Sequence, residues 1–428
     1  MAGSPIKNNK ALQHWSYIFE SRKNNHSTNA KYHWEKFRQL GLPNNKDENW
    51  KYTPLNKLYA QNFSIAPSYN LSSDQIKKFA LPLDAVRLVY FNGYLQYKIS
   101  DIDNDTFQIH NIPAHEDYSI PRAICSEVFL HLTESLLEEI TIINLLSDRP
   151  NDVSSLYLLH ITSGEDNSLN TVNYRHHLHL TGNTHIQVIE HYVSLNTIGH
   201  FTGTRFTISL GNNTRLTHIK LVCENSESYH FAHNDIILAH KSQASTISFF
   251  IGAKLLRHNT SAQLNDKSAE LIINTLSLPI NKEIHDSRSY VEHNKGYCSS
   301  YQLHKTITCN QARSIFNGII KVSKHALKTD SKMLNNNLLI GTLAAVYTKP
   351  QLEIYADDIK CSHGATVGHI EYEQIFYLRA RGISESFAKN IIIYGFIEDL
   401  TGMLKNNIIR KLVLERIACR VPGDKYEF

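Results

Sequence analysis

A short segment near the C-terminus combines residue types that can bind a metal ion. It runs Tyr355-Ala-Asp-Asp-Ile-Lys-Cys-Ser-His-Gly-Ala-Thr-Val-Gly368, in which Cys361 and His363 are two positions apart. On an extended strand such residues point to one face, about 6 to 7 Å apart along the chain, and Gly364 leaves backbone space beside them. Thiolate and imidazole together suit iron, zinc or an iron–sulfur cluster. Cys361 and His363 are therefore candidate metal ligands.

Two ligands do not complete a tetrahedral metal site. The others would have to come from elsewhere in the fold, from sulfide or from another chain. The plainer alternative is a buried cysteine beside a hydrogen-bonded histidine. We expect a second histidine group, His176, His177 and His179, to lie on the surface, because strand alternation divides it between two faces.

Common catalytic motifs are absent from the sequence. It has no Gly-x-x-x-x-Gly-Lys-Ser/Thr, so we do not expect the chain to hydrolyse nucleotide by the P-loop route. It also lacks HExxH, the Gly-x-Ser-x-Gly elbow and a dinucleotide fingerprint. We predict no catalytic turnover by the isolated chain, and any ATP-driven work would come from a partner.

The composition indicates a large folded chain without nucleic-acid or membrane partners. Of the 428 residues, 42% are hydrophobic and 20% charged, which is enough for a sizeable core in two or three regions. The formal charge of +4 is too small for non-specific nucleic-acid binding. The longest apolar stretches, such as Ile140 to Leu146, fall far short of the roughly 18 to 20 residues of a membrane span.

Cysteine usage and the first residues both indicate a cytoplasmic protein. The six cysteines are scattered without any CxxC, which suits reduced thiols better than a disulfide framework. Residues 1–9 have no apolar h-region, so nothing marks the chain for secretion.

A weak internal repeat predicts the main architecture. From about Asn151, short β-type segments follow one another for over two hundred residues, each a polar turn and then alternating apolar residues. Markers for four of these turns, about 25 to 30 residues apart, are Gly182, Gly211, Lys241 and Asp266. The fold we expect is mainly β, a right-handed parallel β-helix (β-solenoid) core with helical N- and C-terminal regions. A β-sandwich is the alternative, but it needs more regular hairpin signals.

The chain divides into four expected regions. They are an N-terminal helical region (1–80), a mixed strand and helix connector (81–150), the β-helix core (151–370) and a C-terminal helical region (371–428). The first two regions should contain a helical stretch over 10–40 broken at Gly41, a docking segment over 47–55, a hairpin turning at Asn92-Gly93 and a helix over 127–140.

Three helices are predicted after Gly368. The first ends near Gly382, the second starts at the N-cap Ser384, and the third covers 407–419. Their apolar residues either pack the helices together or leave one face for a partner. The candidates for a partner-binding face are Ile375, Phe376, Leu378, Phe387, Ile391 and Phe396.

The candidate metal segment belongs to a longer stretch, from Lys349 to Gly368, that resembles the SufB/SufD family of iron–sulfur cluster assembly proteins. Phe376-Tyr-Leu-Arg-Ala-Arg-Gly-Ile383 extends the resemblance, and further matching stretches lie upstream, so nearly the whole chain is covered. They are Glu48-Asn-Trp-Lys-Tyr-Thr-Pro-Leu55, Leu256-Arg-His-Asn-Thr260, Phe316-Asn-Gly-Ile319 and Thr329-Asp-Ser-Lys-Met-Leu-Asn-Asn-Asn-Leu-Leu339. The chain looks like the SufD branch, because SufB carries a cysteine where this chain has the run 335–337 and an acidic residue where it has Gly364.

The resemblance implies a scaffold that works in a complex. The expected partners are SufB, through the β-helix, and the ATPase SufC, through the C-terminal helices, with a nascent cluster built at the SufB/SufD interface and a role in iron acquisition. His363 would be the iron or cluster ligand, with Cys361 nearby. We expect the isolated chain to bind no cofactor stably, and the complex to hold iron or a cluster transiently. The isolated chain is also expected to be able to form a homodimer. These residues do not indicate whether the complex binds a flavin.

Two other readings accompany this one. A partner that only stabilises SufB would need no metal contact at His363. A β-helix carbohydrate lyase or esterase would need carboxylates and basic groups clustered on one outer face, whereas the repeat strands offer mostly neutral alternation.

Overall fold

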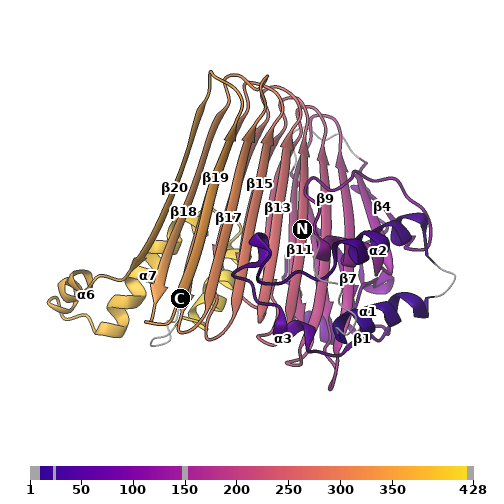
Figure 1. Ribbon diagram of the computed structural model, residues 1–428, viewed down its shortest axis with the longest axis horizontal. Coiled ribbons are helices and arrows are strands. Elements are labelled where there is room, and N and C mark those ends of the chain that lie inside the picture. Colours follow the sequence, from indigo (N-terminus) through magenta and orange to yellow (C-terminus); the bar gives the residue numbers. More distant parts are fainter. Residues whose placement is uncertain (1–9, 23–25, 147–152, 422–428) are drawn as a thin grey trace.

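The computed structural model describes residues 10–22, 26–146 and 153–421 of the chain. They form two ten-stranded sheets wound into a β-solenoid of about seven turns, with helices at both ends of the chain (Figure 1). The predicted β-helix is thereby confirmed, and the β-sandwich alternative is wrong. The prediction made for residues 1–9 lies outside the described residues.

The strands alternate between the two sheets along the chain. The first sheet contains, in spatial order, β4 (Phe107–Pro113), β5 (Glu139–Leu145), β7 (Leu169–Leu180), β9 (His200–Leu210), β11 (Tyr229–Leu238), β13 (Leu255–Leu264), β15 (Ile284–His293), β17 (Arg313–Val322) and β19 (Ala345–Ile354), with β1 (Phe63–Ile65) beside β7. The second contains β3 (Tyr94–Leu95), β2 (Val86–Phe91), β6 (Val153–Thr162), β8 (His185–Ser194), β10 (Arg215–Cys223), β12 (Gln243–Phe250), β14 (Glu270–Ser277), β16 (Ser299–Cys309), β18 (Asp330–Ile340) and β20 (Lys360–His369). Residues 81–150, expected as a connector, supply β2 to β5 of these sheets.

Successive coils stack in parallel register, which explains the repeat seen in the sequence. From β8 to β20, paired residues of the second sheet are 27 to 31 positions apart. The turns that lead into β8, β10, β12 and β14 of this sheet each contain a residue with a left-handed backbone, and the markers Gly182 (φ 73°) and Lys241 (φ 52°) are two of these residues. In the other two marked turns the left-handed residues are Asn213 (φ 57°) and Ser268 (φ 61°), two positions after each marker.

The space between the sheets, which we call the lumen, holds apolar side chains and buried histidines. Its largest cluster includes Leu158, Val188 and Phe206. His176 and His177 are also buried, so the surface position expected for them is wrong, and only His179 is exposed. His176 Nε2 lies 2.8 Å from His160 Nε2, and burial lowers the pKa of His176 to about 3. His160 and His176 thus satisfy one ring nitrogen each through their mutual hydrogen bond.

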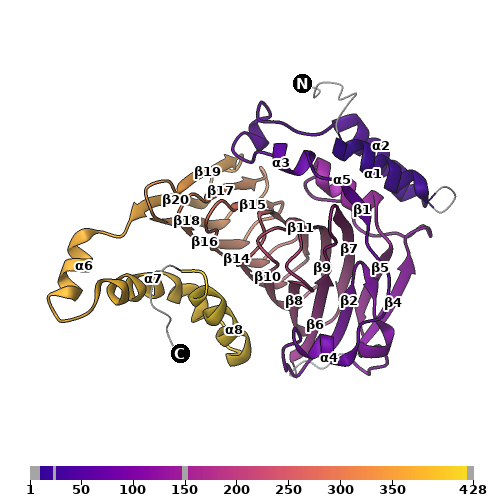
Figure 2. The same cartoon turned by 90° about the horizontal axis from the view of Figure 1, so that it is seen from below.

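The N-terminal helices cover the outer face of the first sheet (Figure 2). The stretch 10–40 forms two helices, α1 (Lys10–Ser21) and α2 (Thr28–Leu40), rather than one. The predicted helix over 127–140 is shorter, α5 (Val128–Ser135), because β5 begins at Glu139. The remaining short elements of this part are η1 (Glu48–Trp50), α3 (Asn56–Tyr59), α4 (Ser73–Lys77) and η2 (Tyr97–Ile99).

Two sequence predictions for this part are confirmed. Trp50 is buried, and the guanidinium carbon of Arg257 lies 3.6 Å from its ring centroid, so the segment 47–55 docks on the first sheet. The hairpin between β2 and β3 turns at Asn92 (φ 48°) and Gly93 (φ 92°), the pair of left-handed residues that a type I′ turn requires.

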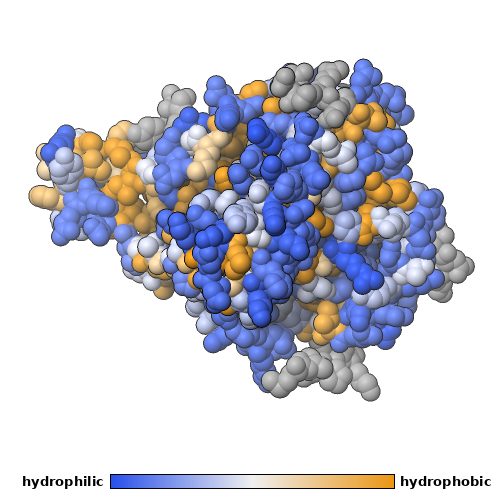
Figure 3. Space-filling model, turned by 90° about the horizontal axis from the view of Figure 1, so that it is seen from above, coloured by the Kyte–Doolittle hydropathy of each residue, from blue (hydrophilic) through white to orange (hydrophobic). Residues whose placement is uncertain are grey.

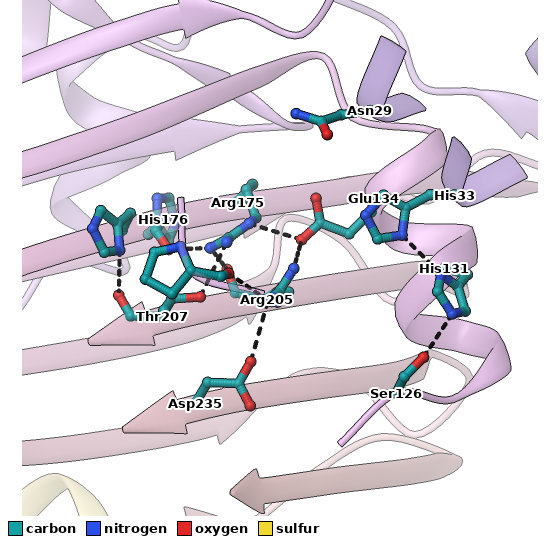
Figure 4. Close-up of polar contacts among 12 residues, drawn as sticks. Asn29, His33, Ser126, His131, Glu134, Arg175, His176, Arg205, Thr207 and Asp235 are labelled. Atoms are coloured by element: carbon teal, nitrogen blue, oxygen red, sulfur yellow. Dashed lines mark hydrogen bonds and ion pairs between the residues drawn. The ribbon is translucent and has the colours of Figure 1, made fainter. Parts of the chain in front are cut away.

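A buried ion-pair network attaches α5 to the first sheet (Figure 4). Glu134 Oε1 forms ion pairs with Arg175 Nε at 2.8 Å and with Arg205, which also pairs with Asp235 at 3.3 Å. Tyr118 donates its hydroxyl to Glu134 Oε2 at 3.2 Å. Burial alone would raise the pKa of the Glu134 carboxyl. The charges of the two guanidinium groups have the larger effect, and the net result is a pKa lowered to about 2. The ionised Glu134 carboxylate therefore helps to hold α5 on the first sheet.

Replacing this anion tests the network. Glu134→Gln keeps the shape of the side chain but leaves two buried guanidinium groups without their shared counter-ion, so we expect the free energy of unfolding to fall by about 3 to 5 kcal/mol. The ionised carboxylate contributes its full stabilisation above the ordinary pKa of 4.5 and loses it as the pH falls towards 2. The free energies of unfolding of the unaltered protein and of Glu134→Gln should therefore converge in that pH range. Urea unfolding at pH 7 and pH 4 measures both effects. The exposed Glu116→Gln is the control, and equal stability of both variants at pH 7 would contradict the prediction.

Candidate functional site

The β-helix ends at strands that have a neighbour on one side only. Among the described strands, β20 pairs with β18 and β19 pairs with β17, and these two are the last of their sheets. All residues of β20 are exposed except Cys361 and Gly364, which are half-buried. This end, formed by β19 and β20 and called the open end below, therefore presents unpaired backbone groups to solvent.

Cys361 and His363 lie at the open end with their side chains on the lumen side of β20. In the register with β18, Cys361 pairs with Ser331 and His363 pairs with Met333, and both partners are buried lumen residues. The two candidate ligands thus share one face, as strand alternation predicts. His363 is exposed, so a second chain can reach its imidazole. Gly364 faces outward, where an added Cβ would lie 3.2 Å from Leu334 Cδ2.

The lumen side of the open end also carries apolar side chains. Cys361 packs against a small core cluster that includes Phe316, Ile320 and Met333. On β20, Val367 is 50% exposed, and on β19 Ile354 is 42% exposed. Exposed apolar side chains beside unpaired strand edges are the features that a further β-strand layer would cover.

The described residues hold too few ligands for a metal ion on their own. No group of three or more His, Cys, Asp and Glu side chains in the described ranges is arranged to hold a metal. Burial raises the pKa of the Cys361 thiol, and Asp330 adds to this, so the free thiol is neutral at physiological pH. Metal binding at Cys361 would have to displace that proton. The chain can offer one imidazole and one thiol, and a complete site needs ligands from outside.

Three C-terminal helices follow β20. They are α6 (Tyr372–Arg379), α7 (Glu385–Thr401) and α8 (Asn407–Ala418), close to the predicted ranges. Gly382 (φ 84°) follows the end of α6, and the Ser384 side chain accepts from the Phe387 amide at 3.3 Å, as predicted for its cap. The buried faces of α7 and α8 pack on the outer face of the second sheet through Ile393, Ile397, Leu400, Ile409, Val413 and Ile417. None of the described helices is long and apolar enough to cross a membrane.

Half of the six predicted partner-binding residues are exposed. Phe376 is 60%, Phe387 39% and Ile391 37% exposed. Ile375 is buried, while Leu378 and Phe396 are half-buried. Sequence reasoning missed Tyr372 and Tyr377, which are 75% and 56% exposed. Tyr372 stacks on Phe376 one turn later, and an i, i+4 aromatic pair is the signal that could have found it.

These exposed residues gather on one part of the surface. Figure 3 shows hydrophobic surface at the left end of the molecule, over α6 and the adjoining part of α7. We call the exposed side chains there the α6–α7 patch: Tyr372, Phe376, Tyr377, Phe387 and Ile391. Contiguous exposed aromatic surface of this kind is typical of protein interaction sites.

Comparison with known proteins indicates the family of this chain. Residues 160–396 match the model of the SUF system FeS cluster assembly, SufBD core domain. The chain is 49% identical to iron–sulfur cluster assembly protein SufD of Escherichia coli (strain K12) over 426 residues, 99% of each chain. It is 27% identical to an iron–sulfur cluster assembly SufBD family protein of Synechocystis, over 89% of this chain and 88% of that one.

These matches define a β-helix protein of iron–sulfur cluster assembly. The chain belongs to the SufB/SufD family, as its residues suggested. Within that family the near full-length match places it with SufD. This assignment leaves no support for the carbohydrate-active alternative.

Thiol reactivity tests the environment of Cys361. We expect the exposed Cys419 to react first with iodoacetamide at pH 7, and the half-buried Cys361 more slowly. Because only the thiolate reacts, the Cys361 rate should rise about tenfold per pH unit below its raised pKa. A mass-spectrometric time course with peptide assignment measures each rate, and Cys361→Ser controls for the assignment. Fast, pH-independent labelling of Cys361 would instead reveal a stabilised thiolate and contradict the prediction.

Proposed function

We propose that this chain is a non-catalytic scaffold subunit that completes a metal site together with another chain. The observation that supports this most directly is the exposed His363 on an edge strand, with Cys361 on the same face and no third ligand among the described residues. The other ligands come from a partner or from sulfide. In this role the chain contributes an imidazole to a nascent iron–sulfur cluster, or to iron delivered for it, and the cluster is substrate rather than a resident cofactor.

The open end is the proposed contact with SufB. An edge strand with free N–H and C=O groups can be extended by a strand of a second β-helix, and the apolar layer at Val367 and Ile354 would be buried by that contact. A paralogue with the same coil spacing provides matching strand edges. In the absence of SufB, a second copy of this chain would occupy the same surface, which accounts for the proposed homodimer.

The α6–α7 patch is the proposed contact with the ATPase SufC. The patch is aromatic and exposed, while the opposite faces of α7 and α8 are anchored on the second sheet. A motor bound there supplies the ATP-driven work for which the sequence has no P-loop. The complex works in the cytoplasm, where the six cysteines, all free in the structure, remain reduced. Flavin binding is not part of this proposal.

Replacing His363 distinguishes two hypotheses: that this chain contributes a metal ligand, and that it only stabilises the complex. We expect His363→Ala to lower cluster yield on the reconstituted complex about tenfold or more, because the imidazole is lost as a ligand, while the complex remains assembled. Absorption spectroscopy with iron and sulfide determination measures yield, and size-exclusion chromatography measures assembly. Ser362→Ala, on the opposite face of the same strand, is the control. Unchanged yield with His363→Ala would leave the chain as a structural partner only.

Point substitutions test the α6–α7 patch better than truncation, because removing α7 and α8 would uncover the apolar outer face of the second sheet. We expect Phe376→Glu combined with Ile391→Glu to weaken SufC binding by about 2 kcal/mol or more, roughly 30-fold. Isothermal titration with purified SufC measures the change. Tyr17→Glu, at a 71% exposed tyrosine on α1, is the matched control. Binding that is insensitive to the double change would move the SufC contact elsewhere.

A further inference from the structure

A cavity of about 930 Å³ lies away from the open end and the α6–α7 patch. It is formed between α3, with the residues just before it, and the turns that lead from the second sheet into β11, β13, β15 and β17. None of its lining residues belongs to β19, β20 or the C-terminal helices. Cavities of this size are typical of small-molecule sites.

Three cationic side chains at this cavity have no ion-pair partner among the described residues. They are Lys57 from α3, Lys282 from the turn before β15, and Arg313 at the start of β17. All three are exposed, so they border the solvent side of the cavity. The other charges nearby are already paired: Lys254 with Glu227 at 2.6 Å, and Glu283 with Arg420. The cavity therefore carries a net positive charge that a ligand can neutralise.

The positions of two of these cations suit phosphate groups. Arg313 pairs in register with Ile284, two residues after Lys282, so the two cations come from adjacent coils. Adjacent parallel strands are about 4.8 Å apart, a spacing that lets neighbouring cations contact one phosphate or two linked phosphates.

Two buried polar atoms of the lining residues make no hydrogen bond to a described protein atom. The first is the hydroxyl of Tyr229, a residue only 2% exposed. The second is Oε1 of Glu283, which is 4% exposed and uses its other oxygen, Oε2, for Arg420 and for the Ile280 amide at 3.0 Å. Buried polar groups in folded proteins nearly always have partners. Both atoms are shielded from solvent, so a ligand in the cavity contacts them only when the side chains that cover them move aside. Burial raises the pKa of Tyr229 to about 12, which leaves its hydroxyl a donor at neutral pH.

The rest of the lining is apolar. Pro54, Leu255 and Ile284 contribute hydrocarbon surface to the same cavity. A bare inorganic anion would use the cations but leave this surface and the two buried polar atoms unused. The cavity as a whole fits a ligand that has a charged end, hydroxyl groups and an apolar ring.

We propose that this cavity is a binding site for a mononucleotide. Lys57, Lys282 and Arg313 bind the phosphates, Glu283 Oε1 accepts from a ribose hydroxyl, and the base lies against Leu255 and Ile284 with the Tyr229 hydroxyl donating to it. The inference goes beyond the proposed scaffold function and does not depend on it.

Binding to the full-length chain tests this site directly. The probes are ADP, GDP, UDP and CDP in a metal-free buffer, with adenosine and pyrophosphate as the separate halves of ADP. We expect at least one nucleoside diphosphate to saturate a single site with a dissociation constant below about 100 μM, and each half of that nucleotide to bind at least about tenfold more weakly. Isothermal titration measures the affinities.

Variants connect binding to the named residues. Lys282→Ala with Arg313→Ala should weaken nucleotide binding about tenfold or more, while Lys267→Ala, an exposed lysine in another turn, should not change it. Tyr229→Phe should weaken binding about threefold to tenfold without lowering the unfolding midpoint, because it removes a hydroxyl that has no protein partner. Because Tyr229→Phe changes neither the charge of the cavity nor the stability of the fold, weaker binding by this variant would report the loss of the hydroxyl contact alone.

Three results would overturn the proposal. The first is that no diphosphate binds below about 1 mM, the affinity expected of non-specific charge contacts alone. The second is that binding survives the loss of Lys282 and Arg313. The third is that pyrophosphate binds as tightly as the nucleotides, which would show an anion site without nucleoside recognition.

Discussion

Parallel stacking of coils is the constraint on which the rest of this structure depends. Each strand satisfies its backbone groups only through the next coil, so the stack must end in unpaired edges unless something closes it. At one end, the antiparallel pairs β2–β3 and β4–β5 finish the two sheets. At the other end, β19 and β20 have no further strand among the described residues. The candidate ligands lie at this second end, on β20.

The lumen shows a second consequence of the same stacking. The space between the sheets takes in polar side chains, and many of these hydrogen-bond to one another. Glu190 accepts from His218 at 2.7 Å and from Lys220 at 3.2 Å. Burial lowers the pKa of His176 and His304 to about 3, so both rings are neutral in the folded chain. Since the unfolded chain binds these protons from about pH 6.5 downward, the fold loses stability as the pH falls through that range.

The sequence predicts those features that depend on local periodicity. The turn residues Gly182 and Lys241, the shared face of Cys361 and His363, and the cap at Ser384 are all set by residues close in the chain. Features that depend on long-range packing were either not predicted or predicted wrongly. His176 and His177 were placed on the surface because alternation alone does not show that both faces of β7 are covered. The cavity beside α3 joins this helix to turns more than 150 residues later, and no local pattern marks such a cavity.

The open end and the α6–α7 patch are connected by a very short stretch of chain. The strand that carries His363 ends at His369, and α6 begins at Tyr372. Figure 1 shows α6 standing away from the sheets, whereas α7 is fixed to the second sheet, where Lys305 Nζ donates to the Phe396 carbonyl at 2.7 Å. Because β20 is paired on one side only, it is less constrained by neighbours than the strands inside the second sheet. A force applied to α6 by a bound motor would therefore act first on the strand that holds the candidate ligands, and the anchored helices behind it would keep the rest of the β-helix in place.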